Sequence, residues 1–137
     1  MSARTTLARE ISATGTALHA GVTVHMTLSP AASGTGIVFR RSDAGGAMIA
    51  ARYDAVTETS LGTVISGGTV KVAVIEHLMA AVAGAAIDDL LVTLDGPEPP
   101  ILDGDALSYF VLLEKAGRKS QTGTRHAIKL KRDVSVS

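Results

Sequence analysis

The segment Val74-Ile-Glu-His-Leu-Met-Ala-Ala-Val-Ala83, closed by Gly84, decides how this chain is organised. Its apolar residues recur at the three- and four-residue spacing of a helix, and glycine is common just past a helix C-terminus. The next segment, Ile87-Asp-Asp-Leu-Leu-Val-Thr-Leu94, is mostly apolar and has the length of a buried strand. We therefore predict a helix of about three turns that leads directly into a sheet.

On both sides of this pair, the pattern is that of further strands and one more helix. Residues 22–28 alternate between apolar and polar, shorter strand-like segments follow over 36–40, 48–53 and 54–65, and Ser66-Gly-Gly68 is a hairpin signal. A second helix is predicted over residues 107–116. Together these elements predict an α+β fold, a two-layer sandwich in which one antiparallel-rich sheet is covered by two helices.

The same patterns divide the chain into three parts. Residues 1–117 are expected to form the α+β domain, and the polar, glycine-containing residues 118–125 resemble a linker. Residues 126–137 alternate again, so we expect the first strand of a second domain whose remainder is missing from this sequence.

Composition excludes several classes of function. The 137 residues contain 13 Lys and Arg against 13 Asp and Glu, and only 3% aromatics, so no nucleic-acid partner is expected. The absence of Cys excludes disulfides and thiolate metal sites and fits a reducing compartment. No apolar run approaches the roughly 20 residues of a membrane span, and the N-terminus does not resemble a signal peptide. A cytoplasmic location is therefore expected.

One face of the predicted helix carries a pattern that is unusual for a solvent-exposed surface. The face opposite the apolar residues is a strip of small residues (Ala73, Ala80 and Gly84) with Glu76 on one side and His77 on the other. A metal hydrolase needs this combination, because imidazole is a neutral metal ligand and a carboxylate activates water. An exposed ion pair or a helix-packing surface is the more common explanation of such a pattern, and these interpretations remain open at this point.

The other candidate ligands do not complete a metal site. Catalytic zinc usually takes three protein ligands. The remaining histidines are expected in a loop (His19), on the polar face of a strand (His25) and on an exposed segment (His126). The carboxylates Asp88, Asp89, Asp95, Asp103 and Asp105 fall in or near turns, where acidic residues are common. The residues alone therefore offer one credible ligand, His77.

Seven segments, in order and in register, resemble one known family. They are Arg4-Thr-Thr-Leu7, Ala13-Thr-Gly-Thr-Ala-Leu-His-Ala-Gly21, Gly36-Ile-Val-Phe-Arg-Arg41, Thr57-Glu-Thr-Ser-Leu-Gly-Thr63, Ile75-Glu-His-Leu-Met-Ala-Ala-Val-Ala-Gly84, Ile87-Asp-Asp-Leu90 and Asp95-Gly-Pro-Glu-Pro-Pro-Ile-Leu-Asp-Gly104. They resemble the zinc-dependent UDP-3-O-acyl-N-acetylglucosamine deacetylases of lipid A biosynthesis, whose two similar α+β domains hold the active site between them. The resemblance covers residues 4 to about 117.

The resemblance implies roles for three residues. Glu76 would be the general base that activates a zinc-bound water, His77 the zinc ligand of the first domain, and Leu61 a neighbour of the substrate's acyl group. The family's other zinc ligands lie in a His-Lys-x-x-Asp motif of the second domain, which this sequence lacks. The expected function is thus the N-terminal half of an enzyme that hydrolyses the acetamide of a UDP-linked, acylated glucosamine. The chain alone is expected to be inactive without its C-terminal domain.

Five positions depart from the family pattern. Ala17 stands where Gly is usual, Ala20 where Ser or Thr is usual, Gly62 where Cys is common, Asp89 where Asn is usual and Asp105 where Ser is usual. An alternative function is a stand-alone, non-catalytic interaction or dimerisation module. Such a module would dock on a partner or on another copy of itself through the small-residue strip and the unpaired final strand.

Overall fold

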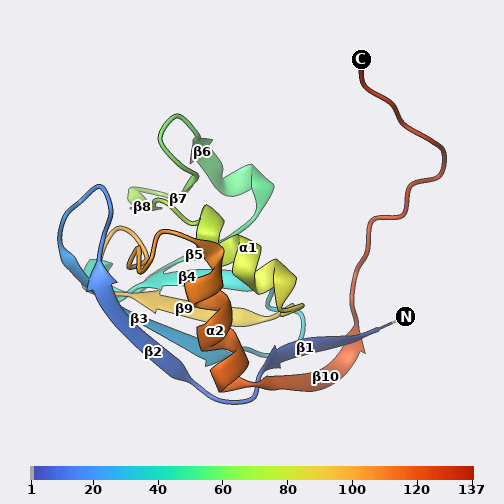
Figure 1. Cartoon of the computed structure of the whole chain (residues 1–137), viewed down its shortest axis with the longest axis horizontal. Coiled ribbons are helices and arrows are strands. Elements are labelled where there is room, and N and C mark those ends of the chain that lie inside the picture. Colours follow the sequence, from blue (N-terminus) through green and yellow to red (C-terminus); the bar gives the residue numbers. More distant parts are fainter. Residues whose placement is uncertain (1) are drawn as a thin grey trace.

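The computed structural model describes residues 2–137, in which the strands form one main sheet and two smaller ones (Figure 1). The main sheet has the order β2-β3-β9-β4-β5. These strands are β2 (Ile11–Thr16), β3 (Thr23–Pro30), β9 (Leu90–Leu94), β4 (Ile37–Arg41) and β5 (Ala47–Ala50). Only the β4–β9 pair is parallel.

The remaining elements cover or extend the main sheet. Helices α1 (Glu76–Gly84) and α2 (Ala106–Ala116) pack side by side over one of its faces (Figure 1). A three-stranded sheet contains β6 (Val56–Glu58), β7 (Val64–Gly67) and β8 (Val70–Val72), and a two-stranded ribbon pairs β1 (Ala3–Leu7) with β10 (Arg118–Thr124). Short 3-10 turns occupy Ser42–Ala44 and Tyr53–Ala55. The predicted α+β class is confirmed, with three sheets in place of one.

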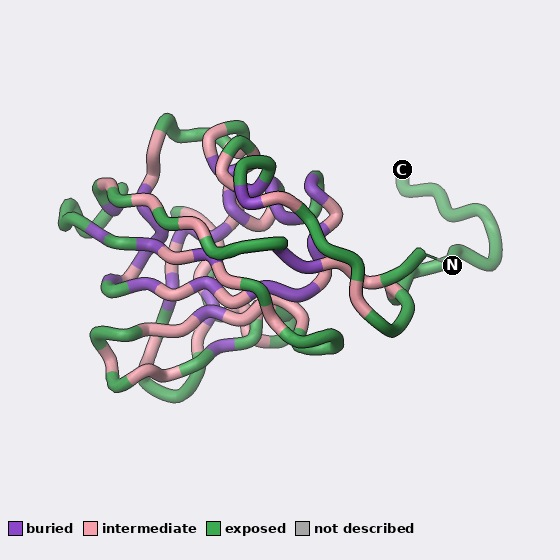
Figure 2. Tube along the Cα trace, turned by 90° about the horizontal axis from the view of Figure 1, so that it is seen from below, coloured by how far each residue is buried: buried purple, intermediate pink, exposed green. Residues whose placement is uncertain are grey.

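The core lies between the main sheet and the two helices. Alternate residues of β3 and β9 are fully buried, as are residues one turn apart on the helices; Figure 2 shows these buried positions gathered in the middle of the molecule. The sheet residues are Val24, Met26, Leu28, Leu90, Val92 and Leu94, and the helix residues are Leu78, Val82, Tyr109 and Leu113. Strand alternation therefore predicted the core face of β3 correctly, except for the exposed Val22, and helical periodicity predicted the core face of α1.

The first helix starts later than its sequence pattern suggests. Val74 has φ of 54°, a left-handed conformation that a β-branched residue rarely adopts, so the helix begins only at Glu76. Strand β9 likewise begins at Leu90, because the preceding residues Asp88 and Asp89 turn toward β1. Neither helix of the described residues is long and apolar enough to cross a membrane.

The C-terminal part differs from its sequence pattern in one respect. The linker predicted over 118–125 is mostly strand β10, which pairs antiparallel with β1; its residues are polar because nearly all of them are exposed. Residues 126–137 form no strand, because no other strand of the described chain lies beside them. Their assignment to a second domain remains a prediction.

A corner of buried charge ties the ribbon to the main sheet. The Asp89 side chain is fully buried. It accepts hydrogen bonds from Arg4 Nη2 at 2.7 Å and from the Gly36 amide at 2.9 Å. Three further groups also donate to it: Arg4 Nε, the Gly34 amide and Gln121 Nε2. Asp88 accepts from the Thr5 amide (2.8 Å) and from Arg125 Nε (2.9 Å). We call this arrangement the Asp88–Asp89 corner.

Candidate active site at the start of helix α1

Glu76 and His77 occupy the first turn of α1, where the sequence placed them. Strand β8 ends at Val72, and the left-handed Val74 turns the chain sharply into the helix. No side chain caps this terminus. The carboxylate of Glu76 is favoured there, because the free amides of a first turn carry partial positive charge.

The loop before β7 holds the Glu76 carboxylate. The Thr63 amide donates to Glu76 Oε2 at 3.1 Å. Gly62 has φ of 131°, and a Cβ atom at this position would lie 3.1 Å from Glu76 Oε1. The glycine therefore allows the loop backbone to lie against the carboxylate. Leu61, the preceding residue of the loop, is 79% exposed beside this contact.

His77 has a free ring nitrogen. Its Nδ1 atom is buried and has no hydrogen-bond partner among the described residues. Buried polar atoms without a partner are rare in folded proteins and call for an explanation. An imidazole nitrogen with no other partner is available to bind a ligand, and neutral imidazole is the commonest metal-binding side chain.

Tyr109 of α2 lies under this site. Burial, together with the nearby carboxylate of Glu76, raises the pKa of Tyr109 to about 12. Its hydroxyl donates to the Pro100 carbonyl. The tyrosine therefore stays neutral at physiological pH and packs the floor of the site.

A second carboxylate, Glu98, positions another loop at the site. Glu98 is 3% exposed and accepts hydrogen bonds from the amides of His19 (3.1 Å) and Ala20 (2.9 Å). The Pro97 carbonyl beside it accepts from the Ala73 amide at 2.9 Å. Three loops thus meet in front of α1, around a hollow of about 160 Å³ lined by His19, Glu58, Leu61, Gly62, Val64, Ala73 and Val74. Glu98 was not among the predicted site residues, because its only signal in the sequence is a carboxylate between two prolines.

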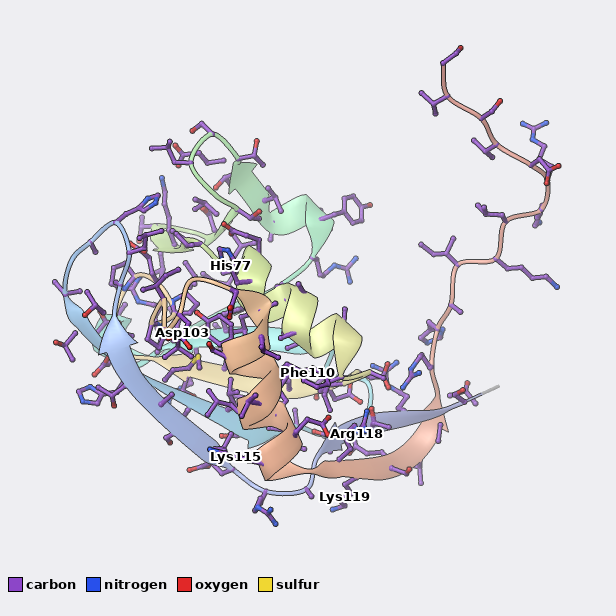
Figure 3. All side chains as sticks on the ribbon, viewed as in Figure 1. His77, Asp103, Phe110, Lys115, Arg118 and Lys119 are labelled. Atoms are coloured by element: carbon purple, nitrogen blue, oxygen red, sulfur yellow. The ribbon has the colours of Figure 1, made fainter. Side chains whose placement is uncertain are left out.

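The remaining candidate ligands lie elsewhere and have structural partners. His25 Nδ1 contacts Asp95 Oδ2 at 2.6 Å near the exposed start of β3, and His126 is exposed. Asp103 and Asp105 bond Ser108 at the start of α2. In residues 2–137, no three side chains of the His, Cys, Asp or Glu type gather closely enough to hold a metal ion. Figure 3 shows His77 and Asp103 at the end of the molecule where the two helices begin.

The small-residue strip on α1 is present but is less open than the pattern predicted. Ala80 and Gly84 are exposed, whereas Ala73 precedes the helix and is half-buried. Glu76 and His77 are half-buried too, because the loops around Gly62 and Glu98 close over this end of the helix.

Glu76 and His77 place a carboxylate and an imidazole together at the start of α1. A hydrolase uses these two groups to activate water. The profile of the UDP-3-O-acyl N-acetylglycosamine deacetylases matches residues 4–137. This chain belongs to that family, which confirms the resemblance found in its motifs.

Three curated relatives illustrate the similarity, and each has the name UDP-3-O-acyl-N-acetylglucosamine deacetylase. The proteins of Alcanivorax borkumensis, Myxococcus xanthus and Coxiella burnetii are 45%, 44% and 39% identical to this chain over 132 residues. The matched region is 96% of this chain but only 43%, 42% and 44% of the respective relatives. The chain therefore spans less than half of their length and corresponds to the N-terminal part of the enzyme.

Proposed function

We propose that this chain supplies one half of the active site of a zinc-dependent deacetylase. In this proposal Glu76 is the general base and His77 is one ligand of the metal. The main support is the buried, unpartnered Nδ1 of His77, next in sequence to a carboxylate that the Thr63 amide holds in place. The donor set fits one position of a zinc ion, and the other ligands would come from the part of the enzyme that this sequence lacks.

The proposed reaction is hydrolysis of the acetamide on a UDP-linked, 3-O-acylated N-acetylglucosamine. A water oxygen adds to the amide carbonyl carbon, the C–N bond breaks, and the products are acetate and a free sugar amine. A bound Zn²⁺ would polarise the carbonyl and acidify the water. Glu76 accepts the proton that the water loses and delivers a proton to the departing amine.

Other residues of this chain would position the reactants. The Thr63 amide holds Oε2 of the Glu76 carboxylate, which leaves Oε1 to accept the proton of the attacking water. Leu61 is exposed at the rim, where it would contact the acyl group of the substrate. The neutral Tyr109 below excludes water from beneath the carboxylate. We propose that the enzyme works in the cytoplasm with its C-terminal domain as the essential partner.

The decisive experiment compares the chain alone with the chain supplemented by the C-terminal part of a relative. Acetate release and bound zinc are measured in both samples. We expect negligible turnover alone, and turnover in the mixture that falls by about 10²–10⁴-fold in Glu76→Gln. His77→Ala should lose zinc as well as turnover. Glu114→Gln, which changes an exposed carboxylate of α2 outside the hollow, is the matched control.

Two results would contradict the proposal. Zinc binding and turnover that survive His77→Ala would exclude the metal-ligand role. Robust, His77-dependent turnover by the chain alone would exclude a half site.

A second candidate function is a non-catalytic dimerisation module. The observation in its favour is that Ile128, Leu130, Val134 and Val136 are exposed on a C-terminal segment that is itself exposed along its whole length. It makes no use of Glu76 or His77.

A further inference from the structure

Glu98 is a buried carboxylate that the proposed reaction does not use. Both of its oxygens accept backbone amides, Oε1 from His19 at 3.1 Å and Oε2 from Ala20 at 2.9 Å. None of the ion pairs among residues 2–137 involves it. A carboxylate that is taken out of water without a cation costs free energy of folding. Stability alone therefore does not explain why a carboxylate occupies this position.

The segment that carries Glu98 is held in place on both sides. Prolines occupy positions 97, 99 and 100 and restrict its backbone. The Pro97 carbonyl accepts from the Ala73 amide at 2.9 Å, and the Pro100 carbonyl accepts from the Tyr109 hydroxyl. The segment thus passes between the β2–β3 turn and the start of α1 (Figure 1). The Glu98 carboxylate therefore projects from a fixed base.

The turn that Glu98 holds forms part of the wall of the hollow in front of α1. Residues 17–22 join β2 to β3, and His19 of this turn lines the same hollow as Leu61. The tip of the turn, residues 18–20, is exposed. Among the described residues, this tip has no hydrogen bond to the body of the molecule other than the two that Glu98 accepts. The position of this wall therefore depends on one side chain.

We propose that Glu98 is a positioning residue, which fixes the His19 turn as one wall of the substrate site. The inference rests on the proposed function, because the hollow lies beside the Glu76 carboxylate at Gly62. Two amide donors need two acceptor oxygens. A carboxylate supplies both, whereas glutamine supplies one and presents an NH2 group to the other amide. Neither Glu76 nor His77 is bonded to Glu98, so its carboxylate acts on substrate binding and not on the chemical step.

Steady-state kinetics of Glu98→Gln test the proposal, in the chain supplemented by the C-terminal part of a relative. We expect KM to rise about five- to tenfold, the effect of one lost hydrogen bond, and kcat to change by less than about twofold. A purely structural role would lower the fraction of folded enzyme, which reduces kcat and leaves KM unchanged. Circular dichroism melts verify that the variant folds.

Asp95→Asn is the matched control. Asp95 belongs to the same loop as Glu98 and also accepts a backbone amide, that of His25 at 2.7 Å. Neither Asp95 nor His25 lines the hollow. KM and kcat of this variant should therefore equal those of the unaltered chain.

Amide hydrogen exchange of the 137-residue chain tests the geometry without turnover. The His19 and Ala20 amides should exchange at least about tenfold more slowly than the Leu18 amide, which has no partner within residues 2–137. Glu98→Gln should abolish this protection for at least one of the two amides. The Ala73 amide, which is bonded to the Pro97 carbonyl, should stay protected in both chains.

Three results would overturn the role of Glu98: fast exchange of both amides in the unaltered chain, an unchanged KM in Glu98→Gln, or an equal rise of KM in Asp95→Asn. Failure of the proposed function has a different signature, which is turnover that survives Glu76→Gln. A mixture without any turnover contradicts the proposed function and, with it, the role of Glu98 in substrate binding. The exchange rates then still show whether Glu98 holds the turn.

Discussion

The polar and charged groups near the two ends of helix α1 differ in how many hydrogen-bond partners they have. Beyond its C-terminal end, Asp89 has two side-chain partners and two backbone amides, and it is fully buried. At its N-terminal end, Glu76 has one amide partner, and the buried Nδ1 of His77 has none within the described chain. The corner satisfies its charges internally, whereas the site leaves polar atoms available.

This difference indicates a division between stability and function. A buried carboxylate with all of its partners holds segments together, and losing it leaves several donors unpaired. A group with unused bonding capacity adds little to folding and remains available to a ligand. Substitutions at the Asp88–Asp89 corner should therefore lower stability, whereas substitutions of Glu76 and His77 should mainly affect function.

The largest effect is expected for Asp89→Ala. The substitution leaves Arg4 and the amides of Gly34 and Gly36 without their buried acceptor, and it should lower the free energy of unfolding by about 3–5 kcal/mol. Glu76→Ala removes one amide bond and a charge at the helix N-terminus, and should lower it by only about 1 kcal/mol. Urea denaturation measures both, and equal losses in the two variants would abolish the distinction between the ends.

Acid should act mainly on the corner. Burial tends to raise the pKa of Asp89, but the bonds from Arg4 and from the Gly36 and Gly34 amides outweigh it and hold the pKa below its ordinary value. The pKa of Asp88 is lowered likewise, against burial, by Arg125 and the Thr5 amide. Because both pKa values are lower in the folded state, their stabilisation is present at neutral pH and is lost as the pH falls below about 4.

The measurement is the free energy of unfolding as a function of pH. Asp89→Asn should be less stable at pH 7 and should show a shallower decline in acid than the unaltered chain. An unchanged slope would show that other carboxylates control acid unfolding.

A smaller effect is expected at Gly62, beside the catalytic candidate. Alanine there places a Cβ atom 3.1 Å from Glu76 Oε1 at φ of 131°, and should cost about 2 kcal/mol. Gly68→Ala is the control: Gly68 also has positive φ, but nothing lies within 4 Å of its added Cβ, so only about 1 kcal/mol is expected. Amide NMR shifts of Thr63 should change in the first variant only. Equal costs would mean that the carboxylate is free to move aside.

The smallest effect concerns two left-handed residues, one at each end of α1. Ala86 has φ of 57°, and Ala86→Gly should raise the free energy of unfolding by up to about 0.5 kcal/mol, because relief of strain slightly exceeds the added chain entropy. Val74 has φ of 54° but is buried. Val74→Gly relieves the strain but loses the buried side chain, so the free energy of unfolding should fall by about 1 kcal/mol. Thermal denaturation of the two variants beside the unaltered chain shows which one is stabilised and which one is destabilised. Stabilisation by Val74→Gly would mean that the cost of backbone strain at this position is larger than the free energy gained by packing the valine side chain.

Periodicity predicted the parts of this fold in which side chains divide cleanly between core and solvent. The alternation of Val24, Met26 and Leu28 and the helical spacing of Leu78 and Val82 were sufficient for that purpose. Strand β10 was missed because none of its residues is buried, so that no apolar alternation marks it. The late start of α1 was missed because a left-handed valine leaves no mark in the residue pattern.

The candidate site was predictable only for its charged members. Glu76 and His77 were identified from residue type and helical position. The amide of Thr63 and the loop contact of Glu98 were not, because backbone donors are the same in every residue. Their participation depends on tertiary contacts between loops that are distant in the sequence.

The pairing of β1 with β10 also sets an order of events during synthesis. Ala3 is opposite Thr124, and Arg4 and Gln121 both reach Asp89, so the first strand made cannot pair until residues 118–124 have been synthesised. On the ribosome, the main sheet and both helices can assemble while β1 stays open, and the corner closes only after residue 125 has emerged. The last folding step of this domain, the pairing of β1 with β10, therefore takes place while the residues that follow position 125 are being translated.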